Sequence, residues 1–158
     1  MTAVRSANWT VVAEGTTARF RVRNFGLNRV TGTIPVRGGA VQGTAVRAEL
    51  DLVALDTGNP KRDADLRKPN LLDSAARATL RFTGTAVDGG LVEGTLALRG
   101  TTCPITLTVR PAPDDRPDAP HLVATGVLDR TALGMRVPRF VIGRHIEVTV
   151  DARLAPAP

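Results

Sequence analysis

The residues that could bind a metal ion or an anionic group are concentrated in the charged stretch 62–67. Asp63 and Asp65 could both touch a metal ion, but residues two apart on a helix point to different faces. Asp63 also has Arg67 four positions later, where the two side chains would pair. The guanidinium of Arg62 or Arg67 could instead hold a pyrophosphate or an oxygenated head group. We favour the ion pair and keep a head-group contact of Arg62, Asp63 and Arg67 as the alternative.

The other reactive residue types lack partners at suitable spacings. His121 and His145 have no further His or Cys at metal-ligand spacing. Cys103 is the single cysteine, and we expect it to be a small buried apolar side chain. No Ser with a nearby His indicates a triad, and no glycine-rich phosphate loop precedes a helix. We therefore predict no catalytic residue, no metal and no cofactor, and we favour a protein that is not an enzyme while leaving that question open.

The charged stretch belongs to a helical insertion in a chain that otherwise predicts strands. Pro60 suits the first position of a helix, and Asn59 before it is a good N-cap. Lys68 precedes Pro69, which disfavours helical backbone at Lys68. The sequence thus predicts a short helix from Pro60, and the segment around it is expected to frame one end of the fold.

Alternation of apolar and polar residues is the dominant pattern. It is clearest where Ala18, Phe20 and Val22 alternate with arginines. Glycine pairs at 38–39 and 89–90 predict turns, and the proline-rich stretch 111–120 predicts a polar connecting loop without packed structure of its own. The residues expected to face inward and to contact a ligand are Phe20, Val22, Ile34, Leu50, Leu52, Leu80, Phe82, Leu96, Leu98, Ile105, Leu107, Ile146 and Val148.

These patterns predict an all-β fold of about eight antiparallel strands, with one short helical insertion after the third long strand. Closure into a barrel removes the sheet edges, so we favour an eight-stranded lipocalin-like barrel over a two-sheet sandwich. Such a barrel is either filled by side chains or holds one small apolar ligand. Several inward positions carry small residues, which favours a cavity: Ala18, Gly32, Ala48, Gly84, Ala86 and Ala152.

Length and charge limit the number of domains and the kinds of partner. A chain of 158 residues with 42% apolar side chains predicts a single domain over 1–158, with an ordered core at about 8–154 and a frayed tail at 155–158. The net charge is +6. We attribute it to a solvated surface, although a basic face could meet an acidic partner or a membrane surface transiently. Few aromatic residues are present, which weighs against nucleic acid.

No signal peptide and no apolar run of membrane-spanning length is visible. We therefore expect a cytoplasmic protein, unless a leader has been removed. The oligomeric state stays open, and a homodimer is compatible with the sequence.

The chain resembles the YceI-like family of polyisoprenoid-binding proteins, most distinctively at residues 55–67. The matching residues there are Leu55-Asp56-Thr57-Gly58-Asn59, Arg62-Asp63 and Leu66-Arg67. Further matches follow in chain order at Trp9-Thr10-Val11, Phe20-Arg21-Val22-Arg23, Thr31-Gly32-Thr33-Ile34, Gly94-Thr95-Leu96, Arg99-Gly100-Thr101-Thr102-Cys103-Pro104-Ile105, Asp129-Arg130 and Leu133-Gly134-Met135. The resemblance implies a lipocalin-like barrel and a ligand of the isoprenoid lipid or isoprenoid quinone class.

Three functions remain in view. The first, which we favour, is a binding or transport protein that holds one long apolar molecule in the barrel. The second is a catalyst that folds a flexible apolar substrate for cyclisation or isomerisation by orientation alone. The third is a basic interaction protein with a filled barrel.

Overall fold

The computed structural model describes residues 8–24, 28–58, 60–61, 79–98, 100–129 and 145–157. The described residues form nine strands and two short 3-10 turns. The strands are β1 (Asn8–Val11), β2 (Thr17–Asn24), β3 (Asn28–Gln42), β4 (Ala45–Asp51), β5 (Thr79–Val87), β6 (Leu91–Leu98), β7 (Thr101–Pro111), β8 (His121–Asp129) and β9 (His145–Pro156). The 3-10 turns are η1 (Ala13–Gly15) and η2 (Leu52–Ala54).

The strands close into an antiparallel barrel. Their order around the sheet is β1-β3-β2-β9-β8-β7-β6-β5-β4, and β4 pairs back onto β3. β2 and β1 both lie between β3 and β9, with β2 pairing to residues 28–35 of β3 and β1 to residues 40–42. They share one strand position, interrupted at η1, so nine strands fill eight positions. The predicted all-β, eight-stranded lipocalin-like barrel is confirmed.

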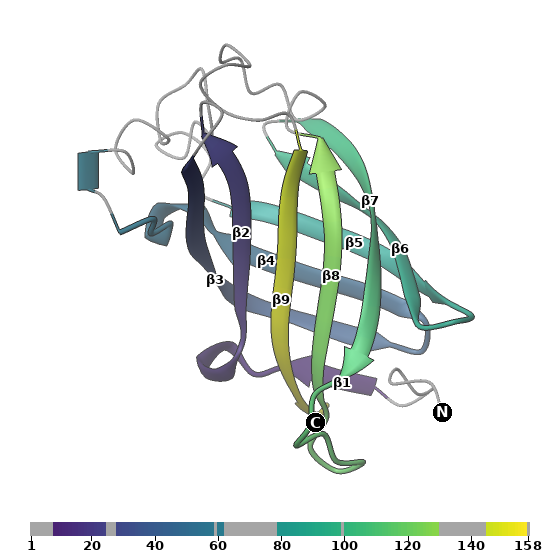
Figure 1. The fold of residues 1–158 in the computed structure, drawn as a ribbon. Coiled ribbons are helices and arrows are strands. Elements are labelled where there is room, and N and C mark those ends of the chain that lie inside the picture. The colour runs from purple at the N-terminus through teal and green to yellow at the C-terminus, as the bar shows by residue number, and fades with distance from the viewer. Residues whose placement is uncertain are drawn as a thin grey trace.

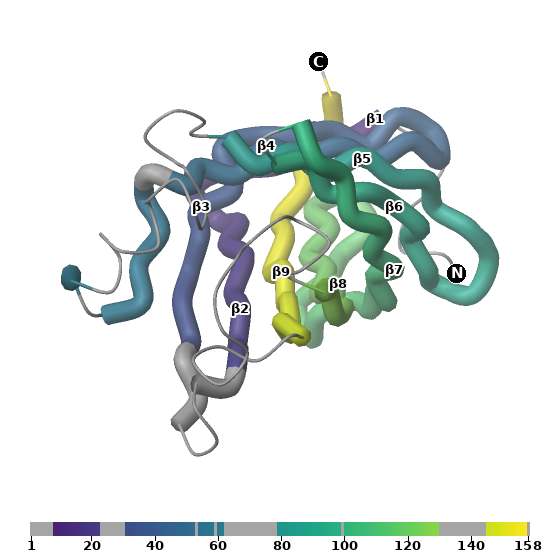
Figure 2. The backbone as a smooth tube through the Cα atoms, turned by 90° about the horizontal axis from the view of Figure 1, so that it is seen from above, coloured from purple at the N-terminus to yellow at the C-terminus, as the bar shows by residue number. Residues whose placement is uncertain are grey.

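The barrel is built of two crossing layers. In Figure 1, β2, β9, β8 and β7 stand side by side at the front, while β4, β5 and β6 run slanted behind them. Figure 2, seen from above, shows the strands arranged in a ring around the interior. β1 crosses the lower end of the front layer, beside the end of β9.

The alternation in the sequence translates into an inner and an outer face. On β2, Ala18 and Val22 are buried whereas Arg19 and Arg21 are exposed. The apolar residues are inside because their burial removes surface from water, and the arginines stay solvated. The predicted orientation of this strand is confirmed.

One of the two predicted glycine turns is correct and one is wrong. The chain reverses at residues 88–90, where Gly89 has φ 86°. At Gly38 and Gly39, however, β3 continues, and its register against β4 shifts between Val36 and Gly38. Gly39 is needed because β4 comes close: a Cβ there would lie 2.4 Å from the carbonyl oxygen of Arg47. The turn follows at residues 43–44.

Two segments expected to lack packed structure have it. Residues 155 and 156 belong to β9, where Ala155 pairs with Thr10 of β1, so the frayed-tail prediction is wrong for them. In the loop 112–120, Ala112 is buried and its N–H donates to the carbonyl of His121 at 2.8 Å. Arg116 and Ala119 form a further bridge. The tail was misjudged because its partner in β1 is distant in sequence. The contacts within the loop are short-range, but its composition did not indicate them.

Of the predicted helical insertion, the structure describes only the first two residues. Pro60 and Lys61 are helical, at the predicted place between β4 and β5, and the remainder to residue 78 lies outside the described residues. In the part of the chain that the structure describes, no helix is long and apolar enough to cross a bilayer.

Candidate ligand cavity

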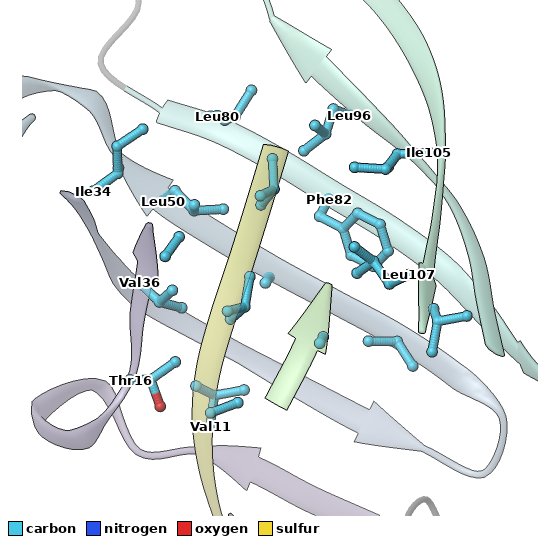
Figure 3. Close-up of a pocket in the computed structure, with 18 of the residues that line it drawn as sticks. Val11, Thr16, Ile34, Val36, Leu50, Leu80, Phe82, Leu96, Ile105 and Leu107 are labelled. Atoms are coloured by element: carbon cyan, nitrogen blue, oxygen red, sulfur yellow. The ribbon is translucent and has the colours of Figure 1, made fainter. Parts of the chain in front are cut away.

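The barrel interior contains a cavity of about 230 Å³. Side chains from all eight strand positions line it, and Figure 3 shows part of this lining. Twelve of the thirteen predicted inward residues are on its wall. The exception is Val22, which is buried two residues before the end of β2 but does not line the cavity. The barrel is therefore not completely filled by its own side chains.

The cavity wall also includes residues that the sequence did not single out. They are mostly branched aliphatic side chains, including Val11, Val36, Val41, Val92, Leu128 and Leu154. Val92 could have been found by extending the alternation of β6 backwards from Leu96. Val41 was missed because the register shift after Val36 moves the inward positions of β3 from even to odd numbers.

The wall is almost wholly apolar. Among the described lining residues, the polar ones are Thr16, Arg19 and Arg47. The hydroxyl of Thr16 is already used, because it accepts a hydrogen bond of 3.0 Å from the backbone N–H of Arg153. Arg19 and Arg47 are exposed to solvent, so their charged groups are not part of the apolar surface inside the cavity. A wall of this kind favours a neutral apolar chain, since a buried polar group without a partner is costly.

One end of the cavity is closed by a cluster around Trp9. Trp9, Val41, Leu122 and Leu154 are each buried and pack together, with Val11 against them. β1 brings Trp9 under the barrel, and its pairing with the end of β9 holds it there. We call this cluster of four buried residues the floor.

The opposite end is where β2, β4, β6 and β8 finish. Leu52 and Leu55, which follow β4, are almost fully buried in the main core. Asp56 then pairs with Thr33 through two backbone hydrogen bonds of 2.8 and 3.0 Å, which extends the wall beyond β4. The predicted mouth residues Arg62, Asp63 and Arg67 lie outside the described residues, so their roles stay predictions.

Cys103 is buried at this end, as predicted for a small apolar side chain. Its sulfur lies 3.8 Å from the carbonyl oxygen of Asp129. Among the described residues, no three His, Cys, Asp or Glu side chains are arranged so that they could hold a metal ion.

A charged cluster on the outer wall near the floor was not predicted. His121 is buried, although its carboxylate neighbours are exposed. Its Nδ1 contacts Asp114, and its Nε2 lies 2.5 Å from Oδ1 of Asp151. Its backbone N–H donates to Asp115 at 2.8 Å, and Arg153 donates to Asp114 at 3.1 Å. These bonds hold the loop 112–120 against β8 and β9.

The electrostatics of this cluster favour a charged imidazole. A neutral imidazole has one N–H, whereas both ring nitrogens of His121 face carboxylates. The hydrogen bond to Asp114, and then that to Asp151, raises the pKa of His121. The same bond from His121 lowers the pKa of Asp114. The residues are seven and thirty positions from His121, so no local spacing could have indicated the cluster.

Several of the described surface arginines have carboxylate partners. Arg21 pairs with Glu147 at 3.1 Å, and Arg37 and Arg81 pair with Asp51 and Glu49 at 3.7 and 3.8 Å. Exposed pairs of this kind contribute little to stability. They do neutralise part of the basic surface, which supports a solvated surface over a dedicated anion site.

An antiparallel barrel that encloses an apolar cavity defines a lipocalin-like protein with the architecture of a small-molecule binder. The YceI-like domain family matches residues 9–154, and the chain belongs to this family. No match was found among curated proteins.

Solved structures of other family members and related domains share the fold. A polyisoprenoid-binding domain from Saccharophagus degradans is 15% identical, with a TM-score of 0.71 over 94% of this chain and 98% of that one. BcnA of Burkholderia cenocepacia is 12% identical, with a TM-score of 0.69 over 90% and 98%. The YceI protein of Campylobacter jejuni is 13% identical, with a TM-score of 0.66 over 86% and 90%. At these identities, the likeness shows the fold.

Proposed function

We propose that this protein binds one long apolar molecule of the isoprenoid lipid or isoprenoid quinone class in its barrel cavity and carries it. The observation that supports this most directly is the continuous apolar wall around an interior space. The family and the polyisoprenoid-binding domain from Saccharophagus degradans support the class of ligand. Binding would need few polar contacts, since each 100 Å² of buried apolar surface contributes about 2.5 kcal/mol.

The size of the cavity constrains how such a ligand lies. Its volume of about 230 Å³ is below the roughly 300–1,000 Å³ of pockets that enclose a drug-sized ligand. The apolar tail of a long ligand would therefore fill the cavity. The rest of the ligand would protrude from the barrel at the end opposite the floor. The head group would lie where β4 passes into the segment that carries Arg62, Asp63 and Arg67.

Native mass spectrometry of protein purified without detergent tests the proposal. We expect a bound mass, which extraction and fragmentation should identify by its regular methyl branches. Delipidated protein should then take up geranylgeraniol. Protein that carries nothing and takes up neither geranylgeraniol nor a straight-chain alcohol would overturn the proposal.

A matched pair of variants on β8 places the site. Ala124 lines the cavity, whereas Val127 on the same strand points outward and is 53% exposed. Ala124→Trp should fill the cavity and abolish uptake, whereas Val127→Trp should leave it unchanged. Equal uptake by both folded variants would show that the ligand binds elsewhere.

A further inference from the structure

Two phenylalanine rings in the barrel lie directly against glycines. A Cβ built on Gly32 would be 2.4 Å from Cζ of Phe20. One built on Gly94 would be 2.5 Å from both Cε1 and Cζ of Phe82, and one on Gly84 would be 2.9 Å from Cζ of the same ring. Real Cβ atoms do not approach so closely, so each ring occupies the space that a side chain would take.

The strand register explains these contacts. Phe20 on β2 stands directly opposite Gly32 on β3. Phe82 on β5 stands opposite Leu96 and is therefore diagonal to Gly94, which is itself opposite Gly84. All these positions face inward, because they share the alternation of the buried residues on their strands. Each ring can thus lie along the wall, over bare backbone, instead of standing into the interior.

Inward glycines within strands need a physical reason. A glycine in a strand interior loses about 0.5–1 kcal/mol relative to alanine and provides no side chain to pack. Neither Gly32, Gly84 nor Gly94 has a positive φ, so backbone conformation does not demand a glycine there. A Cβ on Gly32, Gly84 or Gly94 would also lie 3.0, 3.0 or 2.6 Å from a backbone oxygen, that of Asp56, Glu93 or Thr83 respectively. In each case the aromatic ring is the nearer contact.

We propose that Gly32, Gly84 and Gly94 are recesses that hold the rings of Phe20 and Phe82 against the wall, and so set which chains the cavity accepts. This inference rests on the proposed function. A side chain in a recess would force the ring into another staggered rotamer, toward the interior. An apolar cavity of roughly 150 Å³ accommodates a benzene molecule. An inward ring would therefore take a large share of the 230 Å³ present here.

The recesses favour a chain with side branches. A methyl-branched isoprenoid is wider than a straight alkyl chain. Its binding therefore depends more on the cavity width that remains when the rings of Phe20 and Phe82 lie against the wall. The inferred determinant of ligand class is thus the cross-section of the cavity and not a polar contact. Loss of one recess should act more strongly on a branched chain than on a straight one.

Gly32→Ala is the primary test, with geranylgeraniol and hexadecanol as the two probes. We expect binding of geranylgeraniol to weaken about tenfold or more, as excess volume does in a tight apolar pocket, with a smaller change for hexadecanol. The double variant Gly32→Ala/Phe20→Leu should restore geranylgeraniol binding, because the shorter side chain no longer meets the new methyl group. Gly84→Ala should show the same selective loss of geranylgeraniol binding. It replaces Gly32→Ala as the test variant if Gly32→Ala does not fold.

Gly38→Ala is the matched control. Gly38 is also in β3, and a Cβ there meets nothing within 4 Å. This change should leave both affinities unaltered. Gly94 is less suitable for the test, since a Cβ there would lie 2.6 Å from the backbone oxygen of Thr83, whereas the nearest backbone oxygen is 3.0 Å from a Cβ on Gly32 or Gly84.

The outcomes separate this inference from the proposed function. If the unaltered protein takes up neither probe, the proposed function fails. If it binds geranylgeraniol, and folded Gly32→Ala and Gly84→Ala bind both probes as the unaltered protein does, the recesses do not select the ligand. A crystal structure of Gly32→Ala with the Phe20 ring still against β3 would overturn the inference in the same way.

Discussion

Nε2 of His121 lies 2.5 Å from Oδ1 of Asp151, and the other ring nitrogen of His121 meets Asp114. One imidazole thus joins the loop after β7 to the start of β8 and to β9. On the inner side of the same wall, Leu122 belongs to the floor. The charged cluster outside and the apolar floor inside therefore stabilise the same end of the barrel.

Stability should depend on pH through this cluster. The pKa of His121 is raised above its ordinary 6.5, so the folded state binds the proton more tightly than the unfolded chain does. Its stabilising contribution is then fully present below about pH 6.5 and is lost as the pH rises through the raised pKa. The pKa of Asp114 is lowered from 3.8, so its contribution is present above that pH and is lost on further acidification.

Thermal unfolding of His121→Gln against the unaltered protein measures this effect. From about pH 5 to about pH 10, the loss of stability in the variant should shrink as the pH rises. His145→Gln is the control, since His145 is exposed at the start of β9. A loss of equal size at every pH would mean that His121 acts by packing alone.

Removing the centre of the floor should destabilise the barrel. Trp9 is 7% exposed, and Trp9→Ala should lower the free energy of unfolding by about 3–5 kcal/mol. Val127→Ala, at an exposed position, should change it by no more than about 0.5 kcal/mol. Denaturant unfolding measures both. Equal small effects would show that β1 contributes little to closing the barrel.

Inward and outward neighbours on β7 should differ sharply. Leu107 is buried and lines the cavity, whereas Thr108 is exposed. Leu107→Asp should abolish uptake of a lipophilic fluorescent probe or unfold the chain, because an unpaired carboxylate is costly in an apolar interior. Thr108→Asp should be tolerated. Two folded variants with equal uptake would contradict a ligand at Leu107.

Substitution of Arg67 distinguishes an ion pair with Asp63 from a contact with the head group of the ligand. If it pairs with Asp63, Arg67→Gln should lower the free energy of unfolding by about 0–1 kcal/mol and leave ligand affinity alone. We expect this result. A loss of about 1.5–3 kcal/mol for a phosphorylated isoprenoid, without loss for the neutral alcohol, would instead indicate a head-group contact. Titration of both ligands against both proteins, with thermal unfolding alongside, separates the two.

The sequence by itself determined the class of fold and most of the inner face. Alternation is a local property of a strand, so Leu50, Phe82 and Leu107 could be placed inside without knowledge of their neighbours. The turn at 88–90 was also predictable, since it depends on adjacent glycines with positive φ.

Tertiary structure decided whatever depends on partners far apart in the chain. The pairing of β2 with β9 and that of β1 with the end of β9 join the two ends of the chain. These pairings, and the shift after Val36, follow from registers that no single strand encodes. The same registers place Gly32 under Phe20 and bring Asp114 and Asp151 to His121. A strand's own pattern specifies which face is inward, whereas only the folded sheet specifies which residues meet across it.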